Sequence, residues 1–169
     1  RAIRRAAAKY IAPLLKKDLL IITQGFIAAT AEGVPTTLGR NGSDYSASLL
    51  GAALDADEIQ IWTDVNGILT ADPTIIPSAK PLQMMTFDEA SELAYFGARV
   101  LHPASIQPAM EQSIPVRVLN SHFPEEKGTI IVPNITVREK PHVKSIAYKE
   151  NITLVTLQSS SLLFSPEIM

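Results

Sequence analysis

Short runs rich in Ile, Val and Leu alternate along this chain with segments of helical pattern, and this alternation narrows the possible folds more than any other feature. The predicted strands are residues 19–23, 58–65, 115–119 and 129–132. The first run is apolar at successive positions, which is typical of a strand buried on both faces, as in a parallel sheet. Strands that alternate with helices indicate an α/β layered fold.

Helical pattern fills the intervals between these strands. The predicted helices are residues 1–15, 43–54, 86–96 and 103–112. The third of them has a clear start signal, because Thr86 and Glu89 have the spacing of a capping box. Residues 71–81 contain three prolines and are predicted to form a long loop.

The composition excludes several classes of site. With 169 residues, of which 46% are hydrophobic, the chain can bury one sizeable core. A net charge of −2 gives no long-range attraction to nucleic acid or to anionic membranes, and the absence of cysteine rules out disulfides and thiolate metal sites. No apolar run reaches the roughly 18 residues of a membrane span, and the basic first residues lead us to expect no signal peptide. We therefore expect a soluble cytoplasmic protein that binds neither nucleic acid nor membrane.

A change of composition at residues 133–141, with two prolines and mixed charges, predicts a linker. We expect one domain over residues 1–136 and the start of a second over 137–169, opening with short strands at 144–148 and 152–157. The sequence begins without Met inside a predicted helix and ends shortly after a predicted strand. We expect the chain to be part of a longer polypeptide.

The polar run of residues 36–44, Thr-Thr-Leu-Gly-Arg-Asn-Gly-Ser-Asp, is the most distinctive motif. Its two glycines allow a sharp turn and close approach of a ligand. Arg40 presents a planar fork suited to a carboxylate or phosphate. Ser43 or Asp44 can cap the helix that follows, and such a helix start attracts anions. The alternative is a surface turn with Arg40 in an ordinary ion pair.

Two further segments place polar groups at the predicted ends of elements. Thr63 and Asp64 end the strand at 58–65, and ligands of open α/β sheets bind outside the carboxyl ends of strands. Asp64 can accept hydrogen bonds from a ribose or hold Mg²⁺ through water. Arg99 lies between two predicted helices, where it can reach a phosphate. A plain turn after the strand, and a helix corner with Arg99 in solvent, remain the alternatives.

Five segments in a fixed order carry a resemblance to a known family. They are residues 22–26, 36–44, 61–65, 70–73 and 96–103. In these segments the chain resembles the aspartate kinases of the amino-acid kinase family. The resemblance implies a three-layer α/β/α sandwich around a mainly parallel sheet, truncated here, followed by the start of an ACT-type α+β regulatory domain. It also implies transfer of the γ-phosphate of ATP, with Mg²⁺, to the side-chain carboxylate of L-aspartate, the first step toward lysine, threonine and methionine.

The family's site residues transfer to particular positions of this sequence. The resemblance implies that the substrate aspartate is bound by Arg40, Asn41, Gly42, Ser43 and Asp44. It implies that the nucleotide is bound by Thr63, Asp64, Leu69, Thr74, Arg99 and Val100. It further implies a feedback-inhibiting amino acid and a homodimer.

The sequence departs from the family at several of these positions. The family usually has Tyr at the position of Leu69, Arg at that of Thr74 and Lys at that of Arg99, and Asn41 stands where Gly is frequent. Leu69 cannot form a hydrogen bond, and Thr74 lacks the charge for a phosphate contact. No Lys-x-Gly-Gly segment occurs in this sequence, although the family uses its lysine to stabilise the transferred phosphate. We therefore name no catalytic residue in this span, and we expect the chain alone to bind ligands weakly without turnover.

Two alternatives to an aspartate kinase stay open. One is another member of the same family, such as a glutamate, acetylglutamate or uridylate kinase. The other is a non-catalytic kinase-like module that senses an amino acid. The departures at Leu69 and Thr74 favour the second of these, whereas the run at 36–44 speaks against the first.

Overall fold

A computed structural model describes residues 2–17, 19–96, 101–135, 143–148 and 150–153 of the chain. The helix predicted over residues 1–15 is confirmed from residue 2 onward, and it consists of α1 (Ala2–Ala6), a π-helical turn η1 (Ala7–Ile11) and α2 (Ala12–Leu15). Within the described residues, no helix combines the length and the apolar character required to cross a membrane.

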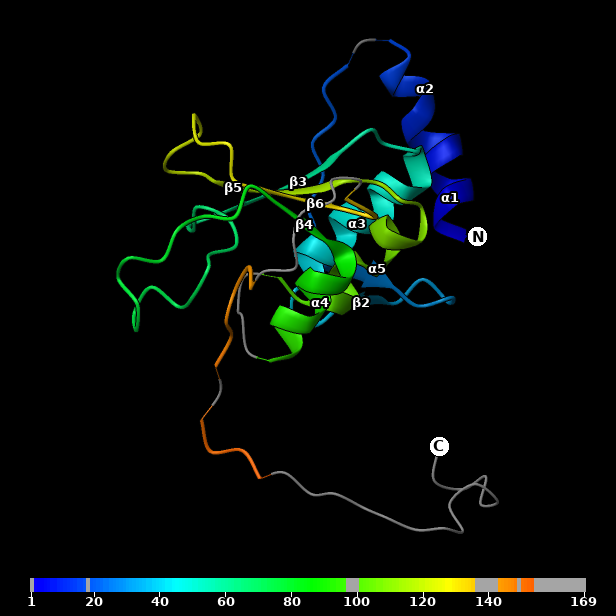
Figure 1. Cartoon of the computed structure of the whole chain (residues 1–169). Coiled ribbons are helices and arrows are strands. Elements are labelled where there is room, and N and C mark those ends of the chain that lie inside the picture. Colours follow the sequence, from blue (N-terminus) through cyan, green and yellow to red (C-terminus); the bar gives the residue numbers. More distant parts are fainter. Residues whose placement is uncertain (1, 18, 97–100, 136–142, 149, 154–169) are drawn as a thin grey trace.

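A four-stranded sheet forms the centre of the molecule (Figure 1). Its order is β3 (Ile59–Thr63), β5 (Val116–Asn120), β6 (Thr129–Val132) and β4 (Met84–Thr86). The pairs β3–β5 and β4–β6 are parallel, and β5–β6 is antiparallel. The sheet is therefore mainly parallel, as predicted. The strands predicted at 58–65, 115–119 and 129–132 are confirmed, whereas β4 was not predicted.

Three helices lie on one side of this sheet in Figure 1: α3 (Gly42–Leu54), α4 (Phe87–Tyr95) and α5 (Pro103–Glu111). The core between them and the sheet is built from alternate strand residues such as Ile59, Ile61, Val116, Val118 and Ile131 together with Phe87, Ala90 and Ile106 of the helices. On the opposite face of β3, Gln60 and Trp62 are exposed. The described residues therefore show two layers, and the full three-layer sandwich stays a prediction.

The helix starts were predicted with mixed success. The capping box of α4 is present, because Thr86 Oγ1 accepts from the Glu89 amide at 3.2 Å and Glu89 Oε2 accepts from the Thr86 amide at 2.8 Å. The predicted cap of α3 by Ser43 or Asp44 is wrong. Asn41 is the residue at the N-cap position, in a left-handed conformation with φ 58° and without a side-chain cap bond. Ser43 and Asp44 lie inside the first turn instead.

The strand predicted at residues 19–23 is wrong. These residues have no strand structure, and Leu20 and Ile22 are 90% and 89% exposed. A strand buried on both faces requires a neighbour in the sheet and a layer on each side, and among the described residues nothing pairs with this run. The next strands along the chain instead form a small antiparallel hairpin, β1 (Ile27–Ala29) with β2 (Pro35–Thr37).

Of the predicted second domain, the structure describes only residues 143–148 and 150–153. Residues 144–148 have no strand structure, so that predicted strand is wrong, and the segment lies near α4 instead. Of the strand predicted at 152–157, residues 154–157 lie outside the described residues. The boundary at 136/137 and the ACT-type region therefore stay predictions.

Candidate functional site

The carboxyl ends of β3 and β5 form a polar edge. Because the two strands are parallel and adjacent, Thr63 lies beside Asn120. The amide and the hydroxyl of Ser121 both donate to the Thr63 carbonyl, at 2.8 and 3.0 Å. The side-chain amide of Asn120 donates from Nδ2 to Asn66 Oδ1, and its Oδ1 accepts from the backbone amide of His122 at 2.9 Å. Such an edge is where open α/β sheets bind their ligands.

Two residues predicted from the sequence, Thr63 and Asp64, lie at this edge. The Thr63 hydroxyl donates to Asp64 Oδ1 at 3.2 Å, and the Asp64 side chain is exposed. Asn120 and Ser121 were not predicted from the sequence, although a polar run directly after an apolar strand was an available signal. Asn120 is only 4% exposed, so its paired amide serves to fix the two strand ends relative to each other.

A long loop, residues 66–83, leaves the sheet at this edge and contains the predicted contacts Leu69 and Thr74 (Figure 1). A cavity of about 430 Å³ lies against it. Its lining includes Val65, Leu69, Asp72, Thr74, Ile146 and Tyr148. The structure therefore brings Leu69 and Thr74 together in one cavity, directly after Thr63 and Asp64 in the chain.

Polar groups inside this loop are largely paired with one another. Asp72 Oδ1 accepts from the Thr74 amide at 2.8 Å and from the Thr74 hydroxyl at 2.6 Å. Tyr148 lines the same cavity, and hydrogen bonding to Glu150, together with partial desolvation and the charge of Asp72, raises its pKa. The Thr74 hydroxyl therefore already donates its proton to Asp72 and is not a free donor for a ligand. The cavity is lined mainly by apolar groups with few polar ones.

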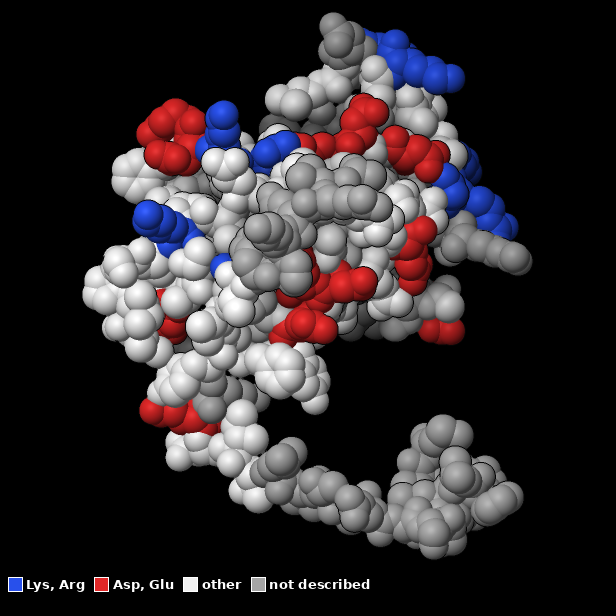
Figure 2. Space-filling model, viewed as in Figure 1, with Lys and Arg blue, Asp and Glu red and all other residues white. Residues whose placement is uncertain are grey.

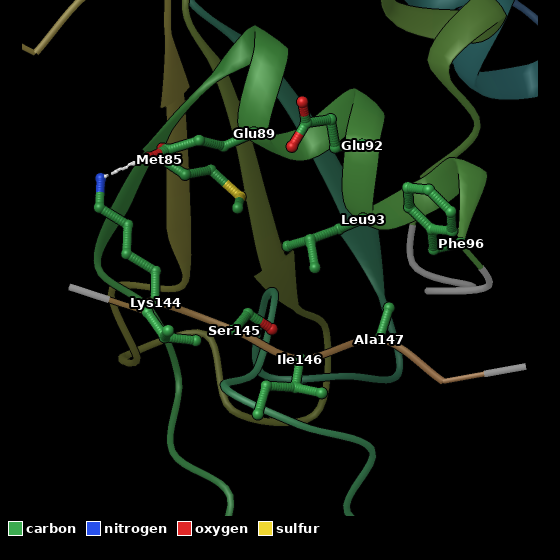
Figure 3. A pocket seen from close by; sticks show the side chains of 10 residues that line it. Met85, Glu89, Glu92, Leu93, Phe96, Lys144, Ser145, Ile146 and Ala147 are labelled. Atoms are coloured by element: carbon green, nitrogen blue, oxygen red, sulfur yellow. Dashed lines mark hydrogen bonds and ion pairs between the residues drawn. The ribbon is translucent and has the colours of Figure 1, made fainter. Parts of the chain in front are cut away.

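The crossing segment, residues 143–148, closes one side of the cavity. The Ser145 hydroxyl donates to the Leu69 carbonyl at 2.8 Å, and the Ile146 amide donates to the Thr70 carbonyl at 3.0 Å. Lys144 Nζ lies 2.9 Å from Glu89 Oε1, and Figure 3 shows this pair beside a second cavity of about 380 Å³ between α4 and the segment. The segment therefore binds to the loop and to the start of α4 at once.

Hydrogen bonds at the start of α4 stabilise the ionised form of Glu89. Burial alone would raise the pKa of Glu89, but hydrogen bonds from Lys144 and from the Thr86 amide outweigh that effect and lower it. Figure 2 shows acidic side chains gathered over α4, which contributes Asp88, Glu89 and Glu92. Lys144 is thus placed against an acidic surface.

The loop before α3 holds Arg40 in the open. Gly39 and Asn41 flank it with φ values of 75° and 58°, so the predicted tight turn is present, and Asn is among the residues that tolerate this conformation. Arg40 and Ser43 are exposed, and Arg40 makes no hydrogen bond or ion pair with any residue that the structure describes. Asp44 is half-buried, and this burial raises its pKa.

Gly42 is the buried member of this loop. A Cβ there would lie 2.9 Å from both Phe26 Cδ2 and Leu38 Cβ, so only glycine fits. Neither of the two cavities described above is lined by residues 40–44. Arg99 and Val100 lie outside the described residues. That the Arg40 loop and the edge at Asp64 face one cleft stays a prediction.

Comparison with known proteins decides the family. The model of the amino acid kinase family matches residues 1–120, which is more than two thirds of the chain. The chain belongs to the amino acid kinase family. Its sequence is 44% identical over 164 residues to lysine-sensitive aspartokinase 3 of Escherichia coli, covering 97% of this chain and 36% of that protein. It is 50% identical over 143 residues to chloroplastic aspartokinase 1 of Arabidopsis thaliana, covering 84% of this chain and 25% of that one.

Among solved structures, E. coli aspartokinase III in complex with aspartate and ADP matches with a TM-score of 0.73 and 47% identity. The match covers 78% of this chain and 29% of that one. This chain therefore spans about a third or less of the length of the aspartokinases it matches. The resemblance to aspartate kinases inferred from the five motifs is confirmed, and the chain is an aspartokinase homologue that corresponds to part of the amino acid kinase domain.

Proposed function

We propose that this chain forms part of an aspartate kinase, which transfers the γ-phosphate of ATP to the side-chain carboxylate of L-aspartate. The observation that carries the proposal is the 44–50% identity to aspartokinases, including a match to the E. coli enzyme that spans 97% of this chain and 36% of that enzyme. The solved relative in complex with aspartate and ADP supports both ligands. The open loop at Arg40 and the polar edge at Asp64 supply suitable chemistry for them.

The nucleotide is assigned to the cavity beside Leu69 and Thr74, with Thr63 and Asp64 at its edge and Arg99 and Val100 completing the site. A cavity lined by apolar groups with a few polar ones suits a nucleotide. Mg²⁺ fits this edge, because it usually keeps several waters and binds one or two carboxylates together with substrate phosphates, and Asp64 is an exposed carboxylate. Bound there, Mg²⁺ would neutralise charge on the phosphates.

The aspartate is assigned to residues 40–44. The Arg40 guanidinium binds a carboxylate of the substrate, and the amides at the start of α3 favour the same negative charge. The attacking carboxylate is already ionised at neutral pH, so the chain has to supply positioning and charge compensation rather than a general base. Arg40 offsets the repulsion between the substrate and the phosphates.

Several further features follow from the same proposal. The residues after 136 would begin a regulatory domain of ACT type that binds an inhibiting amino acid, and the E. coli relative is described as lysine-sensitive. A homodimer and a cytoplasmic location belong to the same proposal. Without a Lys-x-Gly-Gly segment, this chain by itself is expected to be inactive.

The test is phosphoryl transfer by the full-length protein that contains this chain. ADP release is followed by a coupled assay with aspartate, glutamate, acetylglutamate or UMP as acceptor, and an acyl phosphate is trapped with hydroxylamine. The proposal expects ADP release and a hydroxamate with aspartate alone. ADP release with a different acceptor only would favour another kinase of this family.

A non-catalytic module that senses an amino acid is the second candidate. It is favoured by the cavity, where the Leu69 side chain has no polar atom and the Thr74 hydroxyl donates to Asp72. Calorimetric titration of the full-length protein with ADP and with amino acids separates the two. Binding of an amino acid without any binding of ADP would support the module.

A further inference from the structure

The hydroxyl of Thr129 joins the two ends of the loop that carries Leu69 and Thr74. Thr129 is the first residue of β6 and has no exposed surface. Its Oγ1 accepts from the Ile68 amide at 2.8 Å and donates to the Leu82 carbonyl at 2.5 Å. One buried side chain thus satisfies a backbone group near each end of the loop, and Ile68 lies 61 residues earlier in the chain.

Beyond this point, a ladder of hydrogen bonds joins the two arms of the loop. The Leu82 amide donates to the Ile68 carbonyl at 2.8 Å, and the Thr70 amide donates to the Lys80 carbonyl at 2.9 Å. The Thr70 hydroxyl accepts from the Lys80 amide at 3.0 Å. Leu69 lines the cavity and lies between these pairs, so its position depends on this ladder of hydrogen bonds.

The surrounding glycines allow the hydroxyl to come this close. Gly67 has φ 99°, and a Cβ there would lie 2.5 Å from Thr129 Oγ1 and 2.8 Å from the Thr129 amide nitrogen. Gly128 has φ 60°, and a Cβ there would overlap the Val118 carbonyl oxygen. The backbone on both sides of the contact therefore excludes any side chain, and the loop base has one tightly defined geometry.

We propose that Thr129 is a positioning residue for the nucleotide. It lies beneath the cavity and touches no ligand. Its hydroxyl holds Ile68 and Leu82 so that Leu69 and the turn at Thr74 keep their places in the cavity wall. This inference rests on the proposed function, because it assigns the nucleotide to that cavity. It gives no role to Thr129 in binding aspartate, since the loop at Arg40 is a separate part of the chain.

The test compares Thr129→Val with Thr129→Ser in the full-length protein. Valine keeps the volume and removes the hydroxyl, whereas serine keeps the hydroxyl and removes a methyl group. We expect Thr129→Val to raise the KM for ATP by about tenfold while the KM for aspartate stays within about twofold, and Thr129→Ser to restore the KM for ATP. Equal rises in both KM values, or a KM for ATP that valine leaves unchanged, would overturn the inference.

A second variant keeps the test valid if Thr129→Val does not fold. Thr70→Val removes the next hydroxyl of the same ladder at a half-buried position, and it should raise the KM for ATP in the same selective way, by about threefold. No change in the KM for ATP of this variant would count against the inference. A wild-type protein that shows no aspartate-dependent ADP release refutes the proposed function instead, so the two failures are distinguishable.

Discussion

Removing the Arg40 side chain should weaken aspartate binding without weakening the fold. Arg40 is exposed and makes no hydrogen bond or ion pair with the residues that the structure describes. Surface substitutions of this kind change the free energy of unfolding by within about 0.5 kcal/mol. Any larger effect of Arg40→Ala on function must therefore come from a ligand contact rather than from lost stability.

The size of that effect follows from the chemistry of the contact. A hydrogen bond to a charged group contributes about 1.5–3 kcal/mol, and the guanidinium fork can make two with one carboxylate. Losing one such bond alone corresponds to a rise of roughly tenfold to 150-fold in the KM for aspartate. Arg40→Lys keeps the charge but loses the fork, so it should fall between wild type and Arg40→Ala.

The assay is steady-state kinetics of the full-length protein, with aspartate varied at saturating ATP and then ATP varied at saturating aspartate. Arg5→Ala is the matched control, because Arg5 is also exposed and should change neither KM. Thermal denaturation of each variant checks stability. The reasoning fails if Arg40→Ala raises both KM values equally, or if it lowers the melting temperature by several degrees.

Three further substitutions test the fold and the cavity. Hydrogen bonds from Arg117 lower the pKa of Glu58 below its ordinary 4.5. The ionised carboxylate therefore stabilises the fold fully above about pH 4.5, and this contribution is lost as the pH falls through the lowered pKa. Glu58→Gln should therefore cost about 1 kcal/mol in urea denaturation at pH 7 and progressively less as the pH falls through the lowered pKa, and a cost that does not change with acidification would be contradictory. Ile131→Ala, at a fully buried position, should lower the free energy of unfolding by about 2–5 kcal/mol in the same assay, and a loss below about 1 kcal/mol would contradict the packing. Leu69→Tyr restores a phenol oxygen to the cavity and should lower the KM for ATP by roughly twofold to tenfold, whereas an unchanged KM would place the nucleotide elsewhere.

Most of the regular structure could be predicted because local patterns decide it. The strands at 58–65, 115–119 and 129–132 and the capping box at Thr86 depend on alternation and spacing within a few residues. The run at 19–23 was predicted wrongly, since burial on both faces depends on neighbours that local sequence does not specify. β4 was missed because Met84–Thr86 is too short to show a pattern.

The site could be predicted only where its residues follow one another in the sequence. Leu69 and Thr74 belong to one loop, and the structure places them in one cavity. Asn120 and Thr129 were missed, because their roles arise from contacts with residues 54 and 61 positions away. The crossing segment was expected to be a strand and instead closes the cavity, an arrangement set by tertiary contacts of Ser145 and Ile146.

The central claim is that the Arg40 loop and the edge at Asp64 bind the two substrates of one reaction, side by side. A crystal structure of the full-length protein with aspartate and a non-hydrolysable ATP analogue tests it directly. The account predicts the guanidinium of Arg40 on a carboxylate of aspartate, and the nucleotide against Leu69 and Thr74 with its phosphates toward Asp64. Aspartate bound away from Arg40, or a nucleotide bound outside that cavity, would contradict it.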